Sequence, residues 1–433
     1  MVPPNYITRF SDGLKKKGLK AGASHVCRIL TQRTASLLVL LKRNYDLRTK
    51  LPVRIQEMKN ELSLQPDAFL QGIRHRTLSY IESNRKPEIS FGAYSYKPGG
   101  PPILYASCYA ALTKHLYNDL DAMPRSSRQE WISYIQGFQK ENGLFLDPMI
   151  ETPLAEEVDW WGWRHLTLHA LMALEALGGS AEKPFEILRP FKKKGYIYTW
   201  LESRNWRLDP ASVSNEIQNH AVMLQYARDF QGETWCEDSL RDMFDWLDKK
   251  QDPETGLWGE FFNNKHLLSN GVQTGYHLWL LYFYDSRPIH HVDRIIDSCL
   301  ATQNQCGGFG VPLNSSACED IDSIDPLVRF SFVTDYRKED ILQALEKAVP
   351  WLLVNANPDG GWVFRRYEAF LYGHDLMRTE AEQSSMFPAW FRTLALAYLG
   401  KVIGNTPLGS YSWSYVNCPG HQFWRPQVPP YEH

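Results

Sequence analysis

Three aspartates stand within six residues at the start of one apolar stretch of the chain: Asp320, Asp322 and Asp325. Neighbouring carboxylates in a low-dielectric cavity cannot all ionise, so one of them stays protonated and acidic. Such a group can serve as a general acid. A plainer interpretation also fits the spacing, because acidic residues stabilise the positive end of a helix dipole.

Polar residues stand at equivalent places in the other apolar stretches. In chain order they are Ser107, His165, Asn219 with His220, Gln273 with His277, the three aspartates, and Glu382 with Gln383. Helix capping explains each of them alone, but helices that point the same way around an axis bring their amino-terminal ends together, so the set predicts one shared site. We expect catalytic roles for Asp322, Asp320, Asp325, His165, His277 and Glu382, and substrate binding by Trp163, Asn219, His220, Gln273, Tyr276 and Gln383.

An internal repeat indicates which elements carry these residues. Four segments, beginning at Gln139, Gln251, Gln303 and Asn355, run from an amide side chain through a turn to glycine and an aromatic residue. Weaker copies lie at Gly92 and Asn205. The six markers are Gly92, Gly143, Asn205, Gly256, Gly308 and Gly361, and they are spaced by 51, 62, 51, 52 and 53 residues. A near-constant period of this length is typical of repeat architectures.

The repeat predicts pairs of helices. The first helices include 131–138, 240–249, 292–302 and 341–354, each ended by a glycine turn that acts as a left-handed cap. The second helices, at 104–117, 163–177, 215–230, 273–284, 322–332 and 382–399, are more apolar. Helices that are apolar on most sides are buried on most sides, so these should form an inner ring. The predicted fold is all-α, an (α/α)6 toroid over residues 66–403, with an open solenoid as the alternative.

The repeat, as in Gln139, Gly143 and Phe145, resembles the Gln-Trp repeat of squalene and terpene cyclases. Protein prenyltransferase β subunits share that superfamily. The resemblance implies that the amide and the aromatic ring tie neighbouring outer helices together. The run around Asp322 resembles the Asp-x-Asp-Asp acid of class II, protonation-initiated cyclases, with Ser323 in place of the final Asp. It implies that Asp322 is the proton donor to a hydrophobic isoprenoid substrate.

Two other functions stay open. Toroidal hydrolases, lyases and epimerases hold a sugar on aromatic rings while His, Tyr or paired carboxylates move protons. The residues suited to that chemistry are Trp160, Trp161, Trp163, His165, His169, Tyr276 and His277. The third possibility is a non-catalytic toroid that binds a lipid or a partner protein. Cys318, Asp320 and His374 lack the tight ligand pair typical of zinc sites, so no metal and no cofactor are expected.

The two ends of the chain differ from the repeats. Residues 1–65 are expected to form a basic helical extension, because residues 1–60 hold 13 Lys or Arg and 3 Asp or Glu. They suit contact with an anionic membrane surface or an acidic partner, or form a solvated helix without a special role. Residues 404–433 are rich in proline and aromatic residues and are expected to pack on the toroid as a strap over one mouth of its cavity.

Composition narrows the class of protein further. The apolar run at residues 37–41 is far shorter than the roughly 20 residues that span a bilayer, and the first residues do not form a secretory signal. Seven scattered cysteines fit reduced thiols. We therefore expect a cytoplasmic protein, peripheral to a membrane if the basic segment binds lipid, that forms a homo-oligomer or joins a partner subunit. Basic and aromatic residues form no recognisable nucleic-acid module.

Overall fold

Helices make up nearly all the regular structure in the computed structural model, which describes residues 39–150, 161–259, 264–404 and 406–425. The chain divides into two units, residues 1–54 and residues 55–433, and residues 39–64 are helical. None of the helices in these described ranges has both the length and the apolar character needed to cross a membrane.

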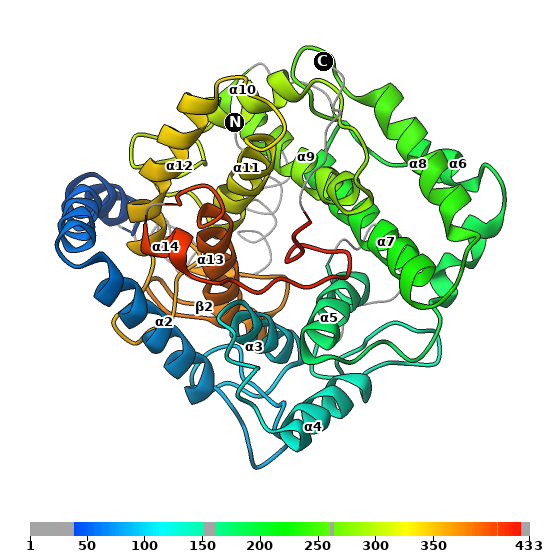
Figure 1. Cartoon of the computed structure of the whole chain (residues 1–433), viewed down its shortest axis with the longest axis horizontal. Coiled ribbons are helices and arrows are strands. Elements are labelled where there is room, and N and C mark those ends of the chain that lie inside the picture. The colour runs from blue at the N-terminus through cyan, green and yellow to red at the C-terminus, as the bar shows by residue number, and fades with distance from the viewer. Residues whose placement is uncertain (1–38, 151–160, 260–263, 405, 426–433) are drawn as a thin grey trace, which may run out of the picture. The chain divides into compact units, whose positions relative to one another are not determined.

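Two sets of helices alternate along the second unit. The inner set is α3 (Leu104–Leu116), α5 (Trp163–Leu177), α7 (Pro210–Phe230), α9 (Lys265–Asp285), α11 (Ala317–Phe330) and α13 (Met386–Leu399). The outer set is α2 (Pro66–Ser83), α4 (Arg125–Gln136), α6 (Tyr196–Glu202), α8 (Cys236–Lys250), α10 (Val292–Ala301) and α12 (Lys338–Leu353). Each inner helix contacts the next one, and α13 contacts α3 (Figure 1). The ring is therefore closed, and the prediction of an all-helical α/α toroid is confirmed.

The burial of the two sets follows their sequences. Every residue of α13 is buried, as expected for a helix that is apolar on most sides. In contrast, α8 buries Leu240, Phe244 and Leu247 on one face. This spacing of three and four residues marks an amphipathic helix of the outer layer.

The repeated glutamine joins neighbouring outer helices. Gln303 Nε2 donates to the carbonyl of Gly307 in its own turn (2.9 Å) and to that of Ala344 in α12 (2.7 Å). Gln139 and Gln251 make equivalent pairs of hydrogen bonds to their own turn and to the next repeat. This is the stabilising role that the family resemblance implies.

The repeated glycines do not cap the outer helices, contrary to the prediction. Helix α4 ends with Gly137 in a right-handed conformation, and the left-handed residues come later, in a tight turn that includes Gly307 (φ +103°) and Gly360 (φ +87°). A Cβ atom on Gly307 would lie 2.3 Å from the Lys347 carbonyl oxygen, and one on Gly360 would lie 2.1 Å from that of Arg76. Glycine is required because the next outer helix approaches the turn this closely.

Segments outside the repeat lie against both ends of the inner ring. Between α12 and α13, strands β1 (Phe370–Leu371) and β2 (Arg378–Thr379) pair antiparallel, joined through the 3₁₀ helix η2 (Asp375–Met377). A second 3₁₀ helix, η1 (Glu186–Lys192), precedes α6. Residues 406–425, which include α14 (Pro407–Ser410), reach the carboxyl ends of inner helices: Gln422 donates to the Leu112 carbonyl and Arg425 to that of Tyr284.

Candidate active site

A cavity of about 170 Å³ lies inside the inner ring. Five inner helices, the β1–β2 hairpin and the C-terminal segment contribute side chains to it. Its lining consists of His165, His169, Ala211, Ser212, Asn215, Gln273, His277, Cys318, Asp322, Tyr372, Phe387, Phe391 and His421. Of the predicted site residues, His165, Gln273, His277 and Asp322 therefore meet in one place.

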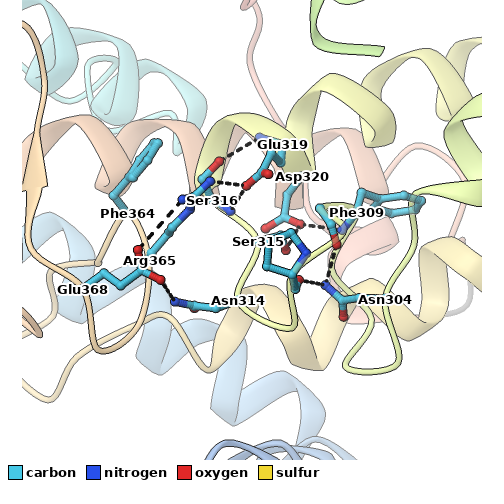
Figure 2. A network of polar contacts seen from close by, with 12 residues as sticks. Asn304, Phe309, Asn314, Ser315, Ser316, Glu319, Asp320, Phe364, Arg365 and Glu368 are labelled. Atoms are coloured by element: carbon cyan, nitrogen blue, oxygen red, sulfur yellow. Dashed lines mark hydrogen bonds and ion pairs between the residues drawn. The ribbon is translucent and has the colours of Figure 1, made fainter. Parts of the chain in front are cut away.

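A capping box fixes the start of α11 and with it the position of the aspartates. The Ser316 side chain accepts from the Glu319 backbone N–H, and the Glu319 carboxylate accepts from that of Ser316. Arg365 pairs with the same carboxylate (2.7 Å) (Figure 2). These contacts fix the position of the first turn of α11, and Asp322 lies in the second turn.

Asp322 presents an unpaired carboxyl group to the cavity. Its side chain is buried, with 3% of the residue exposed, and no residue in the described parts of the chain bonds to the carboxyl oxygens. Burial raises the pKa of Asp322 well above its usual value, and Glu319, Asp320 and Asp325 raise it further. Asp322 therefore holds its proton far more tightly than an exposed aspartate does, as a general acid must.

The neighbouring Asp320 is engaged on all sides. Its carboxylate accepts from the Phe309 N–H (2.9 Å) and the Ser315 hydroxyl (2.7 Å) (Figure 2). Trp351 Nε1 donates to the same carboxylate at 2.8 Å. It also forms a buried ion pair with Arg392. Burial raises its pKa, and these donors oppose that shift. Asp320 therefore joins α11 to its neighbours rather than facing a substrate.

Asp325 is also paired. Arg329 Nε donates to it at 2.6 Å, and the hydroxyl of Tyr276 donates at 3.3 Å. Asp325 and Tyr276, which were predicted to act in catalysis and in substrate binding, thus bond to each other, and neither lines the cavity. Of the three aspartates, Asp322 is the one that faces the cavity.

His165 is held between two tyrosine hydroxyl groups. Tyr105 Oη lies 2.9 Å from Nδ1, and Tyr372 Oη lies 3.2 Å from Nε2. Because Tyr105 donates its proton to the Gly162 carbonyl, it accepts from Nδ1–H, and Nε2 accepts from Tyr372. Burial lowers the pKa of His165 well below its usual value, so the imidazole is neutral.

His277 is held in the same tautomer on the other side of the cavity. Its Nδ1 lies 3.0 Å from Ser214 Oγ, which donates to the Ala211 carbonyl and so accepts from Nδ1–H. Its Nε2 lies 3.3 Å from the amide nitrogen of Asn215. Burial lowers the pKa of His277 to about 4, and this imidazole is neutral too.

His169 lies one helical turn after His165 and differs from it in one respect. Its Nδ1–H donates to the His165 carbonyl (2.7 Å), which leaves the lone pair on Nε2. No hydrogen bond to Nε2 is formed within the described ranges. Burial lowers the pKa of His169 to about 4, although the bond to the carbonyl opposes the shift. His169 is therefore the lining imidazole best placed to accept a proton from a substrate.

Two predicted residues of α7 lie outside this lining. The helix begins at Pro210 rather than at residue 215, so Asn219 and His220 fall in its middle, buried among other helices. The His220 ring lies 4.9 Å from Trp200 of α6 and thus faces the outer layer. Asn215, one turn earlier, takes the place in the cavity that was expected for Asn219.

The residues before α13 are also placed differently from the prediction. Because α13 begins at Met386, Glu382 and Gln383 lie in the preceding loop. Glu382 accepts from Arg366 Nη1 (2.9 Å) and from the Tyr367 N–H (2.6 Å), and Gln383 accepts from the Glu380 N–H. They organise the loop. Trp163 is half-buried at the start of α5, outside the lining.

Two lining residues, Tyr372 and His421, come from segments without a repeat and were not assigned to the site from sequence. No periodic signal marks them. Phe387 and Phe391 lie four residues apart on the predicted sixth inner helix, so helical spacing alone would have placed them on one face.

The zinc interpretation has little support. Cys318 lines the cavity, but Asp320 is bonded to other groups, and His374 Nδ1 accepts from the Leu376 N–H in the hairpin. In the part of the chain that the structure describes, no three His, Cys, Asp or Glu side chains are grouped so that they would hold a metal ion.

Comparisons with known proteins leave the chemistry open. No family model matches this chain, and no curated protein matches its sequence. Among solved structures, a polysaccharide lyase is similar, with 14% identity and a TM-score of 0.44 over 76% of this chain and 96% of the lyase. This degree of similarity carries no information about substrate or reaction.

Proposed function

We propose that this toroid is an acid–base enzyme that acts on a small, neutral, hydroxylated substrate, as a lyase or epimerase of the carbohydrate-active kind. One observation carries the proposal: the protonated, unpaired carboxyl of Asp322 shares a cavity with the neutral imidazole of His169. An acid that keeps its proton and a base that lacks one are the two groups that such a reaction needs.

Both reactions begin with the same proton transfer. His169 Nε2 takes a proton from a substrate carbon next to a carbonyl group, which makes that C–H bond acidic. In an elimination, the C–H electron pair forms a double bond, the neighbouring C–O bond breaks, and Asp322 supplies a proton to the leaving oxygen. In an epimerisation, Asp322 protonates the adjacent carbonyl oxygen while the carbon is deprotonated. The carbon then takes a proton from water on its other face, the enol hydroxyl returns its proton to Asp322, and His169 releases its proton to the water.

The lining supports a hydroxylated substrate over a hydrocarbon. Asn215 Oδ1 is buried and has no partner in the described ranges, and the same is true of His421 Nδ1. A buried polar atom without a partner costs about 1–3 kcal/mol, and an apolar ligand would leave both in that state. A substrate hydroxyl group can donate to Asn215 Oδ1 and accept from the Nδ1–H of His421, whose Nε2 faces the donating Gln218 amide.

The lining also indicates the charge of the substrate and the class of reaction. The described lining residues include no lysine or arginine, which favours a neutral substrate over an acidic sugar. Asp322 is the one carboxyl among them, whereas glycoside hydrolases use two. Lyase or epimerase chemistry therefore fits better than hydrolysis. A volume of about 170 Å³ suits a single sugar ring or the end of a chain.

A protonation-initiated cyclase is the second candidate. Phe387 and Phe391 line the same cavity as Asp322, and aromatic faces stabilise positive charge. This candidate rests on those two rings and on the resemblance of the repeat.

Proton exchange with solvent tests both candidates. The full chain is incubated in D₂O with neutral monosaccharides and short oligosaccharides, and separately with isoprenoid alcohols, and NMR monitors deuterium at carbon. We expect exchange into a sugar that Asp322→Asn and His169→Gln reduce by about 10²–10⁴-fold. His290→Gln, on an exposed outer-face residue, is the control and should retain the activity. Exchange into isoprenoids alone would favour the cyclase, and the absence of both carbon exchange and any unsaturated sugar product would overturn the proposal.

A further inference from the structure

The C-terminal segment closes the carboxyl end of the inner ring. Trp390 Nε1 of α13 donates to Gln422 Oε1 (2.7 Å), and Gln422 Nε2 donates to the Leu112 carbonyl at the end of α3 (3.1 Å). Arg425 donates to the Tyr284 carbonyl at the end of α9 (2.9 Å). The segment therefore connects α13 to the carboxyl-terminal halves of α3 and α9, which belong to distant repeats.

A buried arginine anchors this closure. Arg329 Nη2 donates to the Phe423 carbonyl (2.7 Å) while its Nε pairs with Asp325. Its guanidinium also lies over the rings of Phe423 (4.6 Å) and Trp424 (5.0 Å). A buried charge is stabilised when it is paired, and this one is paired with Asp325 and donates to the Phe423 carbonyl, so the position of the segment is specified.

The anchored segment places one side chain, that of His421, in the lining of the cavity. Gly420 has φ +141°, and a Cβ atom there would lie 2.5 Å from Met172 Sδ of α5. The chain is thus pressed against the inner ring just before His421. The imidazole of His421 lies 5.4 Å from the Phe391 ring and 6.2 Å from that of His169.

The opposite end of the cavity is formed one helical turn away. There the Tyr372 ring stacks on Phe387 at 4.3 Å, and its hydroxyl bonds to His165. Phe391 and His169 each follow these residues by four positions, which is a rise of about 6 Å along a helix. Tyr372 and His421 are therefore the two ends of a cavity about one turn deep.

We propose that His421 is a substrate-positioning residue: it forms the floor of the cavity, binds a substrate hydroxyl group, and restricts the enzyme to a single ring or the terminal ring of a chain. This rests on the proposed function. The His421 imidazole is buried, its Nδ1 has no partner in the described ranges, and its Nε2 lies 3.5 Å from the Gln218 amide nitrogen. An apolar side chain would close the ring equally well, so the polar floor indicates a polar ligand.

NMR of the full chain with ¹⁵N-labelled histidine tests this role directly. The probes are D-glucose, D-mannose and D-fructose, with sorbitol as an open-chain probe, and His421→Gln identifies the resonances. We expect a saturable shift of the His421 ring nitrogens with at least one monosaccharide. No shift with any probe, or deuterium exchange into a sugar while His421 stays unchanged, would overturn the assignment.

Kinetics separate positioning from catalysis. His421→Leu should raise KM about tenfold or more with kcat little changed, and His421→Gln, which keeps hydrogen-bonding capacity, should recover part of the affinity. Asn417→Ala, in the same segment but bonded to Glu175 at the surface, is the matched control. An unchanged KM in His421→Leu contradicts the inference. A His421 shift without any proton exchange or unsaturated sugar product contradicts the proposed function and leaves the binding role standing.

Discussion

Tyr372 Oη and His165 Nε2 lie 3.2 Å apart although 207 positions separate them in the chain. The tyrosine comes from the hairpin that interrupts the sixth repeat, and the histidine comes from the first turn of α5. Tyr105 fixes the tautomer of His165, and the hydrogen bond from Tyr372 uses the remaining lone pair on Nε2 and holds the hairpin against the inner ring.

Tyr372→Phe tests this contact. The variant keeps the ring on Phe387 and removes the hydroxyl alone, so it should lower the free energy of unfolding by about 1–3 kcal/mol because His165 Nε2 loses a buried donor. Urea denaturation measures the change. Tyr336→Phe, which removes a surface hydroxyl bonded to Asp297, is the control and should have a smaller effect. If both variants lowered the free energy of unfolding equally, the buried hydrogen bond would stabilise the fold no more than the surface one.

Asp320→Asn should destabilise the fold strongly. Removing the charge leaves Arg392 buried without its partner, and breaking a buried ion pair in this way costs about 3–5 kcal/mol. Thermal and urea unfolding measure it. The matched variant two residues away, Asp322→Asn, breaks no hydrogen bond within the described ranges and should leave the fold intact at neutral pH. If the two variants were equally stable, the division of roles between the aspartates would be wrong.

Asp322→Asn should also change how stability depends on pH. Because burial raises the pKa of Asp322 in the folded state, the folded protein holds a proton that the unfolded chain releases above about pH 4. The wild-type protein therefore loses stability relative to the variant as pH rises above 4, by about 1 kcal/mol per pH unit until the folded group ionises. Denaturation series at pH 4, 5, 6 and 7 measure the difference, and a constant difference would contradict the raised pKa.

The buried histidines predict the opposite slope. Burial lowers the pKa of His169 and His277 to about 4, whereas in the unfolded chain it is about 6.5. Between pH 6.5 and 4 the unfolded chain binds protons first, so stability falls as pH falls, by about 1 kcal/mol per unit for each histidine. His277→Gln should flatten this slope in denaturation experiments. An unchanged slope would mean that His277 is not buried in its neutral form.

Gln303→Ala should destabilise the ring without altering chemistry at the axis. It removes both donors that join Gly307 to Ala344 and should cost about 1–3 kcal/mol. Gln343→Ala, on the exposed face of α12, is the control and should change unfolding by less than about 0.5 kcal/mol. Loss of proton exchange at unchanged stability would contradict the structural role.

The repeat was readable in the sequence because it rests on local rules. Helical periodicity, the glycine turn and the amide side chain recur in successive units spaced by 51 to 62 residues, so the pairing of helices followed from one chain segment at a time. The role of Gln303 was implied by the family resemblance of the repeat. The first residues of the helices were harder to predict from the sequence. Because α7 begins earlier than predicted, the site was assigned Asn219 in place of Asn215. Because α13 begins later than predicted, the site was assigned Glu382, which does not line the cavity.

The resemblance singled out Asp322 as a proton donor, but only the tertiary structure showed that Asp320 and Asp325 are paired while Asp322 faces the cavity. All three are aspartates on one helix, and their protonation depends on Arg392, Arg329 and the cavity, which distant parts of the chain supply. The same holds for Tyr372 and His421, which no repeat marks. Periodicity can be read directly from a sequence. The charged group that lies beside each carboxyl is decided only when the ring closes. Desolvation inside the closed ring then sets the pKa values on which the proposed chemistry depends.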